Sequence, residues 1–227
     1  MLYSETAARE NIRNRDGKRV FYLGKGDSLT SAARDYLARE RIEILPAEQA
    51  KPEQYRLLGG GMLTEKPEHL THLRGNLLVE KTHPRIAFRG AVDALEARLL
   101  VTRLECPAYR QELNEILTLA RMLIRAEVLE EPLPEGKLCG MTQKEIRERS
   151  HRPQDFYGTP HFMPDMADGP VILHLNLCRC AVRQTELAAA RAFTDENGCC
   201  TRPDILKALN RMSSMVYLLM IREKAGK

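Results

Sequence analysis

The stretch LNLCRCAVRQTE, residues 175–186, decides how the C-terminal part of this chain is interpreted. On a helix, Arg179, Arg183 and Glu186 lie at positions i, i+4 and i+7, so their side chains project from one face. Two guanidinium groups one turn apart suit a polyphosphate, and the carboxylate can orient an arginine, a ribose hydroxyl or a metal ion. A second polar stretch, residues 208–214, lies in another segment of helical period. Together they predict an anionic nucleotide held between helices.

Helical periodicity extends over most of the chain, and we expect it from Thr71 onward. Three apolar stripes repeat at intervals of three and four residues, which is the pattern of helices that bury one face. They are Phe88, Val92, Leu95 and Leu99; Leu113, Leu117, Ala120 and Ile124; and Ile205, Leu209, Met212, Val216 and Leu219. Three or four long amphipathic helices without intervening strands predict a helical bundle.

The N-terminal region has a different pattern. Residues 1–58 predict a small α/β module with a helix from Ser4, a strand over 19–23, a helix from Thr30 to Arg39 and a strand over 42–45. Three consecutive glycines at 59–61 mark a boundary. We therefore expect a mainly α protein: module 1–58, linker 59–70 and bundle 71–227.

Two features interrupt the helical pattern before residue 175. Thr142 and Glu145 form a capping box for a short helix that ends near Ser150. Residues 152–169 are rich in Pro, Gly, Asp and His and carry three aromatic residues, so they predict a long irregular insertion. Loops of this length in compact domains often serve function.

Composition excludes several classes of protein. Lys and Arg number 35 against 31 Asp and Glu, and the net charge of +4 comes with no basic run and 5% aromatic residues. A nucleic-acid partner is not expected. The apolar run 215–221 is too short to span a bilayer and no signal peptide is evident, so we expect a cytoplasmic protein without a membrane partner. Six scattered cysteines without a Cys-x-x-Cys spacing indicate reduced thiols.

Several segments together resemble one family. They are Thr-His-Leu at 71–73, Lys-Thr-His-Pro-Arg at 81–85, Phe-Arg-Gly-Ala-Val-Asp at 88–93, the helix with Arg179, Arg183 and Glu186, the run at 202–211 and the N-terminal stretch 29–37. This set resembles the ethanolamine-utilisation ATP:cobalamin adenosyltransferases. The propanediol type of adenosyltransferase shares a fainter pattern.

The resemblance implies a reaction and a site. The 5′-deoxyadenosyl group of ATP would pass to cob(I)alamin with release of triphosphate, and Mg²⁺ would assist. By resemblance Arg179, Arg183, Glu186 and Asn210 would contact ATP, and Arg179 would face Asp93 of a neighbouring subunit. It also implies a homo-oligomer, with a trimer favoured over a dimer. A reductase partner and association with a bacterial microcompartment stay open.

Three further residues are candidates for binding the anionic ligand. Arg211 extends the polar patch next to Asn210. Lys81 belongs to a basic cluster that is either an anion site or a solvated turn, and Lys25 lies in a short Gly-rich loop that could cradle triphosphate.

An apolar group that crowds the lower corrin face would favour removal of the lower axial ligand of cobalt. Phe162 is the first candidate for this role, and Tyr157 and His161 are the alternatives. The same aromatic loop could instead be a satellite core cluster or an oligomer contact.

One departure from the family pattern concerns metal. Many ethanolamine-type enzymes carry a His-x₁₁-Cys-Cys-x-x-Cys motif before the Thr-His-Leu segment, whereas residues 54–70 contain no cysteine and Cys199-Cys200 stands elsewhere. We therefore expect no metal of that kind. His69 and His72 would share a helical face but lack a third ligand. The departure leaves a second hypothesis open, a non-catalytic carrier or scaffold that binds corrinoid or nucleotide.

Overall fold

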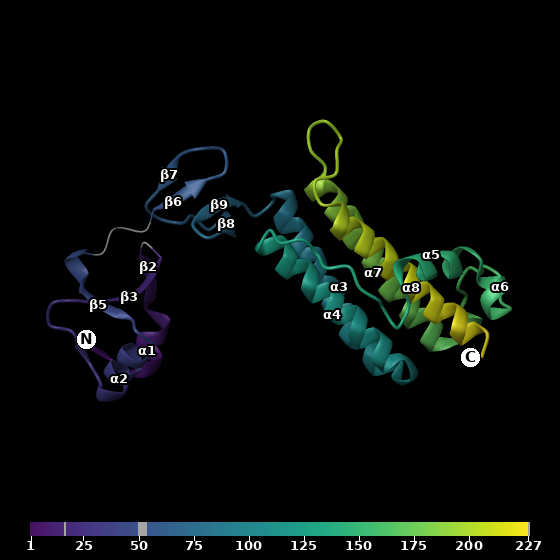
Figure 1. Ribbon diagram of the computed structural model, residues 1–227, viewed down its shortest axis with the longest axis horizontal. Coiled ribbons are helices and arrows are strands. Elements are labelled where there is room, and N and C mark those ends of the chain that lie inside the picture. The colour runs from purple at the N-terminus through teal and green to yellow at the C-terminus, as the bar shows by residue number, and fades with distance from the viewer. Residues whose placement is uncertain (16, 50–53, 227) are drawn as a thin grey trace. The chain divides into compact units, whose positions relative to one another are not determined.

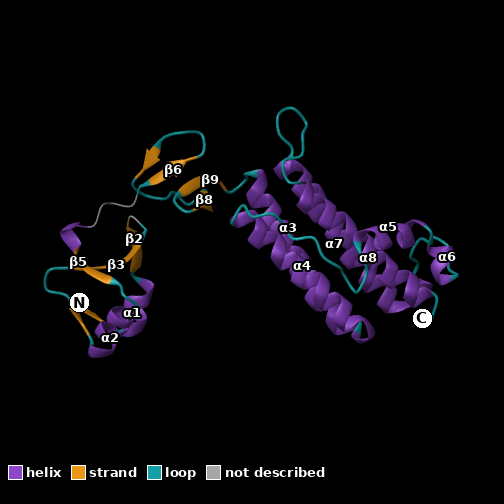
Figure 2. Ribbon diagram, in the orientation of Figure 1, coloured by secondary structure: helices purple, strands orange, loops and turns teal. Residues whose placement is uncertain are grey.

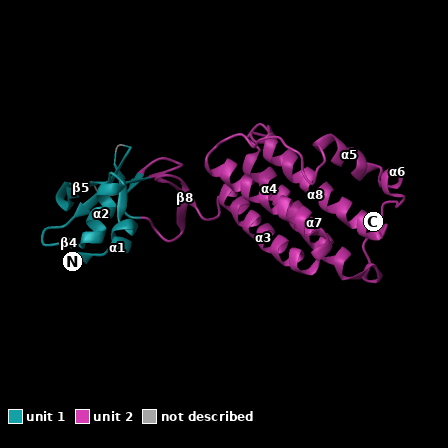
Figure 3. Ribbon diagram, turned by 60° about the horizontal axis from the view of Figure 1, so that its bottom comes forward, with its two compact units in different colours: residues 1–55, 62–65 teal, residues 56–61, 66–227 magenta. Residues whose placement is uncertain are grey.

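The computed structural model describes residues 1–15, 17–49 and 54–226. The chain divides into two compact units, one formed by residues 1–55 and 62–65 and the other by residues 56–61 and 66–227 (Figure 3). The first unit contains short strands and two helices, and the second is dominated by helices. A mainly α fold with a small N-terminal α/β part is therefore confirmed.

Unit 1 combines short strands with helices (Figure 2) and has a hydrophobic core of its own. Its strands are β1 (Leu2–Tyr3), β2 (Ile12–Arg15), β3 (Lys18–Leu23), β4 (Ser28–Leu29), β5 (Glu43–Pro46) and β7 (Met62–Leu63). Its helices are α1 (Glu5–Glu10), α2 (Ser31–Arg39) and the 3₁₀ turn η1 (Ala47–Gln49). Strand β3 pairs antiparallel with β2 and parallel with β5, while β1 pairs parallel with β4.

The predicted helix starts in this unit are confirmed. Ser4 caps α1 and Thr30 caps α2, each by accepting a hydrogen bond from a backbone N–H three residues on. Phe21 on β3 and Leu37 on α2 are fully buried in the core of the unit. The parallel β3–β5 pair requires a crossover connection, and α2 supplies it.

A β-hairpin precedes the bundle in unit 2, and here the expectation of helix from Thr71 is wrong. Strand β9 (Leu77–Glu80) pairs antiparallel with β8 (Leu70–Arg74) and parallel with β6 (Tyr55–Leu57). Gly75 takes a φ of 52° at the turn. Leu70 and Leu73 are buried while His72 and Arg74 are exposed, which fits a bulged strand. His69 and His72 therefore do not share a helical face.

Long helices form the bundle, with short helices beside them (Figure 1). They are α3 (Pro84–Glu105), α4 (Arg110–Val128), α5 (Gln143–His151), α6 (Pro153–Tyr157), α7 (Gly169–Phe193) and α8 (Pro203–Lys224), with the 3₁₀ turns η2 (Pro107–Tyr109) and η3 (Met166–Asp168). The three predicted apolar stripes are buried in one core, except that Ile124 is only partly buried and Leu123 beside it is fully buried. Helix α7 packs against both α3 and α8.

The helix boundaries refine three expectations. The capping box of Thr142 and Glu145 is confirmed at the start of α5. Residues 152–169 are not wholly irregular, because Pro153 starts the short helix α6 and Met166 starts η3. Helix α8 begins at Pro203 and contains the whole predicted stripe from Ile205 to Leu219.

A buried ion cluster joins α3 to α4. The carboxylate of Glu127 on α4 is fully buried and accepts hydrogen bonds from Arg85 and from Arg89, the latter at 2.6 Å. Arg89 also donates to the carbonyl of Leu73 on β8 at 2.8 Å. A buried carboxylate is tolerated only when it is paired in this way, so the cluster fixes the hairpin and two helices together.

All six cysteines are free thiols, as the sequence predicted. Burial raises the pKa of Cys178 to about 12, so its thiol stays protonated. Among the described residues, no helix combines the length and the apolar character that crossing a bilayer requires.

Candidate active site

The antiparallel packing of α7 and α8 determines which of their polar residues face each other. Because the two helices run antiparallel on either side of residues 194–202, Glu186 lies opposite Asn210, and the amide of Asn210 donates to Glu186 at 3.1 Å. Further from the turn, the same register places Arg183 opposite Ser213 and Arg179 opposite Tyr217. The predicted arginine helix and the later polar stretch are therefore brought together within one unit.

A cavity of about 330 Å³ opens beside these residues, and we call it the polar cavity. It is lined by Ser150, His151, His161, Arg179, Arg183, Ser213, Ser214 and Tyr217. These side chains come from α5, α7, α8 and the segment between α6 and η3. The lining contains two guanidinium groups and several hydroxyls, which suits an anionic ligand.

The two arginines of the polar cavity carry uncompensated charge. Arg179 is half-buried and donates two hydrogen bonds to the side-chain oxygen of Asn176, at 3.1 and 3.2 Å, while Arg183 is exposed. Neither arginine has an ion pair among the residues that the structure describes. Two guanidinium groups without a carboxylate partner, one helical turn apart, have the charge and geometry that suit an anionic ligand.

Arg211 and Glu186 lie at the edge of this arrangement. Burial lowers the pKa of Arg211, the charge of Arg147 on α5 adds to this, and Glu186 opposes it. Arg147, Arg211 and Glu186 therefore interact through space across α5, α7 and α8. Arg211 is thus a further cation close to Glu186 of α7.

His161 and Tyr217 fasten the segment between α6 and η3 onto α8. The Nε2 of His161 lies 3.2 Å from the carbonyl of His151, so it must carry the proton, and Nδ1 then accepts from the Tyr217 hydroxyl at 2.9 Å. The two rings stack at 5.8 Å. Burial raises the pKa of Tyr217, although the Phe162 backbone and Arg179 oppose the shift. Tyr217 therefore remains a neutral donor at the cavity wall.

The three aromatic candidates lie in different environments. His161 lines the polar cavity. Phe162 stacks on Tyr217 with ring centroids 6.4 Å apart and packs against the bundle core, as does Tyr157. Met163, next to Phe162, is 89% exposed. The segment thus presents an apolar tip beside the polar cavity.

Asp93 and Lys81 lie outside the polar cavity. Asp93 is exposed on α3 and does not pair with Arg89, whose guanidinium binds Glu127 instead. Lys81 is exposed, with its amine 3.9 Å from Glu68. Of its predicted basic cluster, His83 caps α3 and Arg85 is held by Glu127, so Lys81 is the cation of the three that is left on the surface.

Lys25 belongs to unit 1. A turn closes from Gly24 to Asp27, with the Asp27 amide donating to the Gly24 carbonyl at 3.0 Å. A shallow hollow of about 360 Å³ lies there, lined by Gly24, Lys25 and Glu48 among others. The loop is a turn with one exposed cation, and its lining includes a carboxylate.

Tyr217 and the α5 residues Ser150 and His151 were missed from the sequence. Asn210, Ser214 and Tyr217 occupy positions i, i+4 and i+7 of α8, the same spacing that singled out the arginines of α7. That spacing was a usable signal for Tyr217. Nothing local marks Ser150 or His151, because only the packing of α5 on α8 brings them to the cavity. No cluster of three metal-ligating side chains occurs within 1–15, 17–49 and 54–226.

Comparison with known proteins identifies the family. A family model described as cobalamin adenosyltransferase matches residues 62–223. Corrinoid adenosyltransferase EutT of Salmonella typhimurium (strain LT2) is 30% identical, over 96% of this chain and 90% of that protein. The protein of the same name from Escherichia coli (strain K12) is 35% identical over 160 residues, which are 70% of this chain and 60% of that protein. The chain therefore belongs to the cobalamin adenosyltransferase family.

Proposed function

We propose that this protein transfers the 5′-deoxyadenosyl group of ATP to the cobalt of cob(I)alamin and releases triphosphate. Cobalt supplies the electron pair of the new Co–C5′ bond, and the C5′–O bond breaks with its electrons leaving on triphosphate. Family membership and the EutT relatives support the activity. The observation that carries the site is the pair of uncompensated arginines, Arg179 and Arg183, at the polar cavity.

The arginines act on the leaving group. Negative charge builds on the triphosphate as the C5′–O bond lengthens, and fixed guanidinium groups stabilise that charge without reorganising. Asn210 holds Glu186 in place, so the carboxylate can orient a ribose hydroxyl. The cob(I) ion is itself the nucleophile, so the protein contributes positioning and charge.

The same residues fit a magnesium ion carried by the nucleotide. Mg²⁺ prefers carboxylate and carbonyl oxygens and keeps several waters, and Glu186 with Asn210 offers such oxygens beside the arginines. Bound there, Mg²⁺ would neutralise part of the triphosphate charge. Exposed Lys81 would add further positive charge for ATP, whereas Arg211 lines a neighbouring cavity and would hold a different negative charge.

The segment between α6 and η3 would meet the corrin. Cob(II)alamin is easier to reduce once its lower axial ligand has left, and bulky apolar groups against the lower face favour this. Phe162 is the residue of choice because it is held by Tyr217 beside the polar cavity, with His161 and Tyr157 as alternatives. His161 and Tyr217 are then positioning residues that hold the segment.

We also propose a homo-oligomer, a trimer rather than a dimer. One face of α3 is exposed and built of small or apolar residues, and Leu177 and Leu187 are exposed on α7. The α3 residues of this face are Ala87, Gly90, Ala94, Ala97, Val101 and Leu104. Exposed apolar surface of this extent is typical of subunit contacts. Asp93 beside it would reach Arg179 of a second copy.

The setting follows from the same resemblance. We propose that the protein acts in the cytoplasm, that a reductase delivers the electron that yields cob(I), and that ATP and cobalamin are its ligands. Microcompartment association would fit the role of ethanolamine-utilisation enzymes.

A single-turnover assay tests the proposed function. Chemically reduced cobalamin, ATP and Mg²⁺ are mixed with the protein, and formation of the Co–C bond is followed by absorbance. The proposal predicts adenosylcobalamin and an equal amount of triphosphate. A carrier or scaffold would bind corrinoid without forming the bond, and that result would contradict the proposal.

A further inference from the structure

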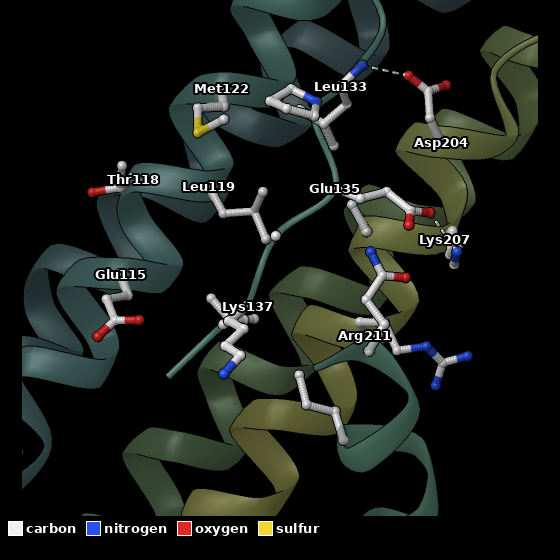
Figure 4. Close-up of a pocket in the computed structure, with 16 residues that line it drawn as sticks. Glu115, Thr118, Leu119, Met122, Leu133, Glu135, Lys137, Asp204, Lys207 and Arg211 are labelled. Atoms are coloured by element: carbon white, nitrogen blue, oxygen red, sulfur yellow. Dashed lines mark hydrogen bonds and ion pairs between the residues drawn. The ribbon is translucent and has the colours of Figure 1, made fainter. Parts of the chain in front are cut away.

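A second cavity, of about 270 Å³, lies on another side of α8, and none of the residues assigned to triphosphate on α7 lines it. It is enclosed by α4, α8, the start of α5 and the extended segment 129–142, which we call the strap. Its apolar wall consists of Leu119, Met122, Leu133, Leu138, Ile146 and Ala208. In Figure 4 the side chain of Leu119 extends from α4 toward the strap, Met122 lies on the same helix, and Lys207 and Arg211 lie on α8 on the other side of the strap. We call this the apolar cavity.

The strap is held above the apolar cavity at two points. The amide of Leu133 donates to Asp204 at 2.9 Å, and the amide of Cys139 donates to Glu115 at 2.7 Å. Between these points Glu135 pairs with Lys207 at 2.6 Å. The hydrogen bonds keep the strap from collapsing onto the apolar wall, so the space beneath it is maintained by the fold.

The carboxylates at the rim are used in these contacts, whereas two cations are not. Asp204 is further held by Arg202 at 2.8 Å, and Glu135 is neutralised by Lys207. Lys137 on the strap and Arg211 on α8 have no ion pair among the residues described by the structure. The mouth of the apolar cavity is therefore suited to a single negative charge on its ligand.

A polar group also lacks a partner at the wall. The side-chain oxygen of Gln143, the first residue of α5, is buried and receives no hydrogen bond among the described residues. An amide side chain can present either its oxygen or its nitrogen at such a position. The apolar cavity thus combines apolar walls, one amide and two free cations, which suits a heteroaromatic base tethered to a phosphodiester.

The polar and apolar cavities are close along the two helices that border both. On α5, Gln143 and Ser150 are seven residues apart, about 10 Å along the axis, and on α8 Arg211 and Ser213 are two apart, about 3 Å. A ligand lying at the polar cavity could therefore extend a side arm of one or two helical turns into the apolar cavity.

We propose that the apolar cavity binds the lower axial base of cobalamin and its phosphodiester after the base has left cobalt. This inference rests on the proposed function, in which that base must be displaced. The base is planar and apolar, and its freed nitrogen accepts a hydrogen bond, which the amide of Gln143 can donate. Its phosphodiester carries a negative charge, with which Lys137 and Arg211 can form ion pairs. Binding of the detached base in the apolar cavity favours the four-coordinate corrinoid, because the cavity binds only the state in which the base has left cobalt.

The test compares cobalamin with cobinamide, a corrinoid without the nucleotide loop. Leu119→Trp fills the apolar cavity, and Leu58→Trp, at an exposed leucine that lines neither cavity, is the matched control. Leu119→Trp is expected to raise the KM for cob(I)alamin about tenfold and to leave the KM for cobinamide and ATP unchanged. The control should change none of them.

A second pair of variants tests the charge without changing the core. Lys137→Ala is expected to raise the KM for cobalamin about threefold, the size of one exposed ion pair, with no effect on cobinamide. Lys144→Ala, an exposed lysine on α5 outside the cavity lining, is the control. The four-coordinate cob(II)alamin signal in electron paramagnetic resonance should weaken in Leu119→Trp and Lys137→Ala but not in the controls.

Three outcomes separate the inference from the function. Equal effects on cobalamin and cobinamide, or no effect on either, would overturn the inference while leaving the adenosyltransferase intact. A raised KM for ATP alone would assign the apolar cavity to the nucleotide and overturn it as well. Lack of turnover by the unmodified protein with both corrinoids would instead contradict the proposed function.

Discussion

Two pairs of arginines in this protein have the same spacing but different surroundings. Arg85 and Arg89 lie one turn apart on α3, and Arg179 and Arg183 lie one turn apart on α7. The α3 pair shares the buried carboxylate of Glu127. The α7 pair has no carboxylate partner among the described residues and faces the polar cavity. The same local pattern thus yields a structural ion cluster in one place and a candidate binding site in the other.

The difference lies in what packs opposite each pair. Helix α4 presents Glu127 to the arginines of α3, whereas α8 presents Ser213 and Tyr217 to those of α7. Neutralised arginines contribute to folding, and uncompensated ones keep their charge for a ligand at some cost to stability. The comparison predicts that substitutions at the two clusters have separable effects on stability and on activity.

The largest effect should follow removal of Glu127. Glu127→Ala leaves two guanidinium groups against a buried gap, and it is expected to lower the free energy of unfolding by about 3–5 kcal/mol. Urea denaturation followed by circular dichroism measures this. An unchanged midpoint would show that the α3 cluster is not structural.

Arg183→Ala should lower activity and leave stability unchanged. We expect kcat/KM to fall about 100-fold or more, because a charge that stabilises the leaving triphosphate is lost, while the unfolding midpoint stays the same. Glu186→Ala should behave similarly, with a smaller loss. Steady-state kinetics together with thermal unfolding check both. Full activity in both variants would remove the α7 cluster from the site.

Tyr217→Phe sharpens the comparison at the wall of the polar cavity. It removes one hydroxyl and the hydrogen bond to His161, so the segment carrying Phe162 should be held less firmly. A net loss of about 1 kcal/mol corresponds to roughly a fivefold fall in kcat with cob(II)alamin and a reductant. The KM for ATP should not change, and a change confined to that KM would contradict the positioning role.

Arg202 and Asp204 form an intermediate case, paired but partly exposed. The hydrogen bond from Arg202 is the main reason that the pKa of Asp204 falls from 3.8 to about 2. A lowered pKa in the folded state stabilises the protein above pH 4, and this contribution is lost as the pH falls toward 2. The stability difference between the parent and Asp204→Asn should therefore be constant at neutral pH and shrink below pH 4.

Much of the fold could be predicted from the sequence because its signals are local. The capping box at Thr142 and the stripe from Ile205 to Leu219 are set by spacing alone, and the structure confirms them. The hairpin over residues 70–80 was not predicted, because its short strands were assigned to the helical region. In the structure the first helix of that region, α3, begins only at Pro84. Its register depends on pairing with β6, which is about twenty residues away in sequence.

Only part of the candidate site could be predicted from local sequence patterns. The face of Arg179, Arg183 and Glu186 follows from helical spacing, and the antiparallel hairpin adds Asn210. Arg85 and Arg89 have the same spacing as Arg179 and Arg183, so spacing alone could not tell a structural pair from a binding pair. The residue that makes the difference, Glu127, lies about forty residues away in sequence. His151 and Ser150 join the polar cavity only through the packing of α5.

Calorimetry with tripolyphosphate and Mg²⁺ tests the central claim most directly, because this probe has neither adenosine nor corrinoid. The parent protein and Gln184→Ala, an exposed neighbour on α7, should bind tripolyphosphate equally. Arg183→Ala should bind at least tenfold more weakly. Equal binding by Arg183→Ala and the parent would contradict the assignment of the α7 arginines to the triphosphate.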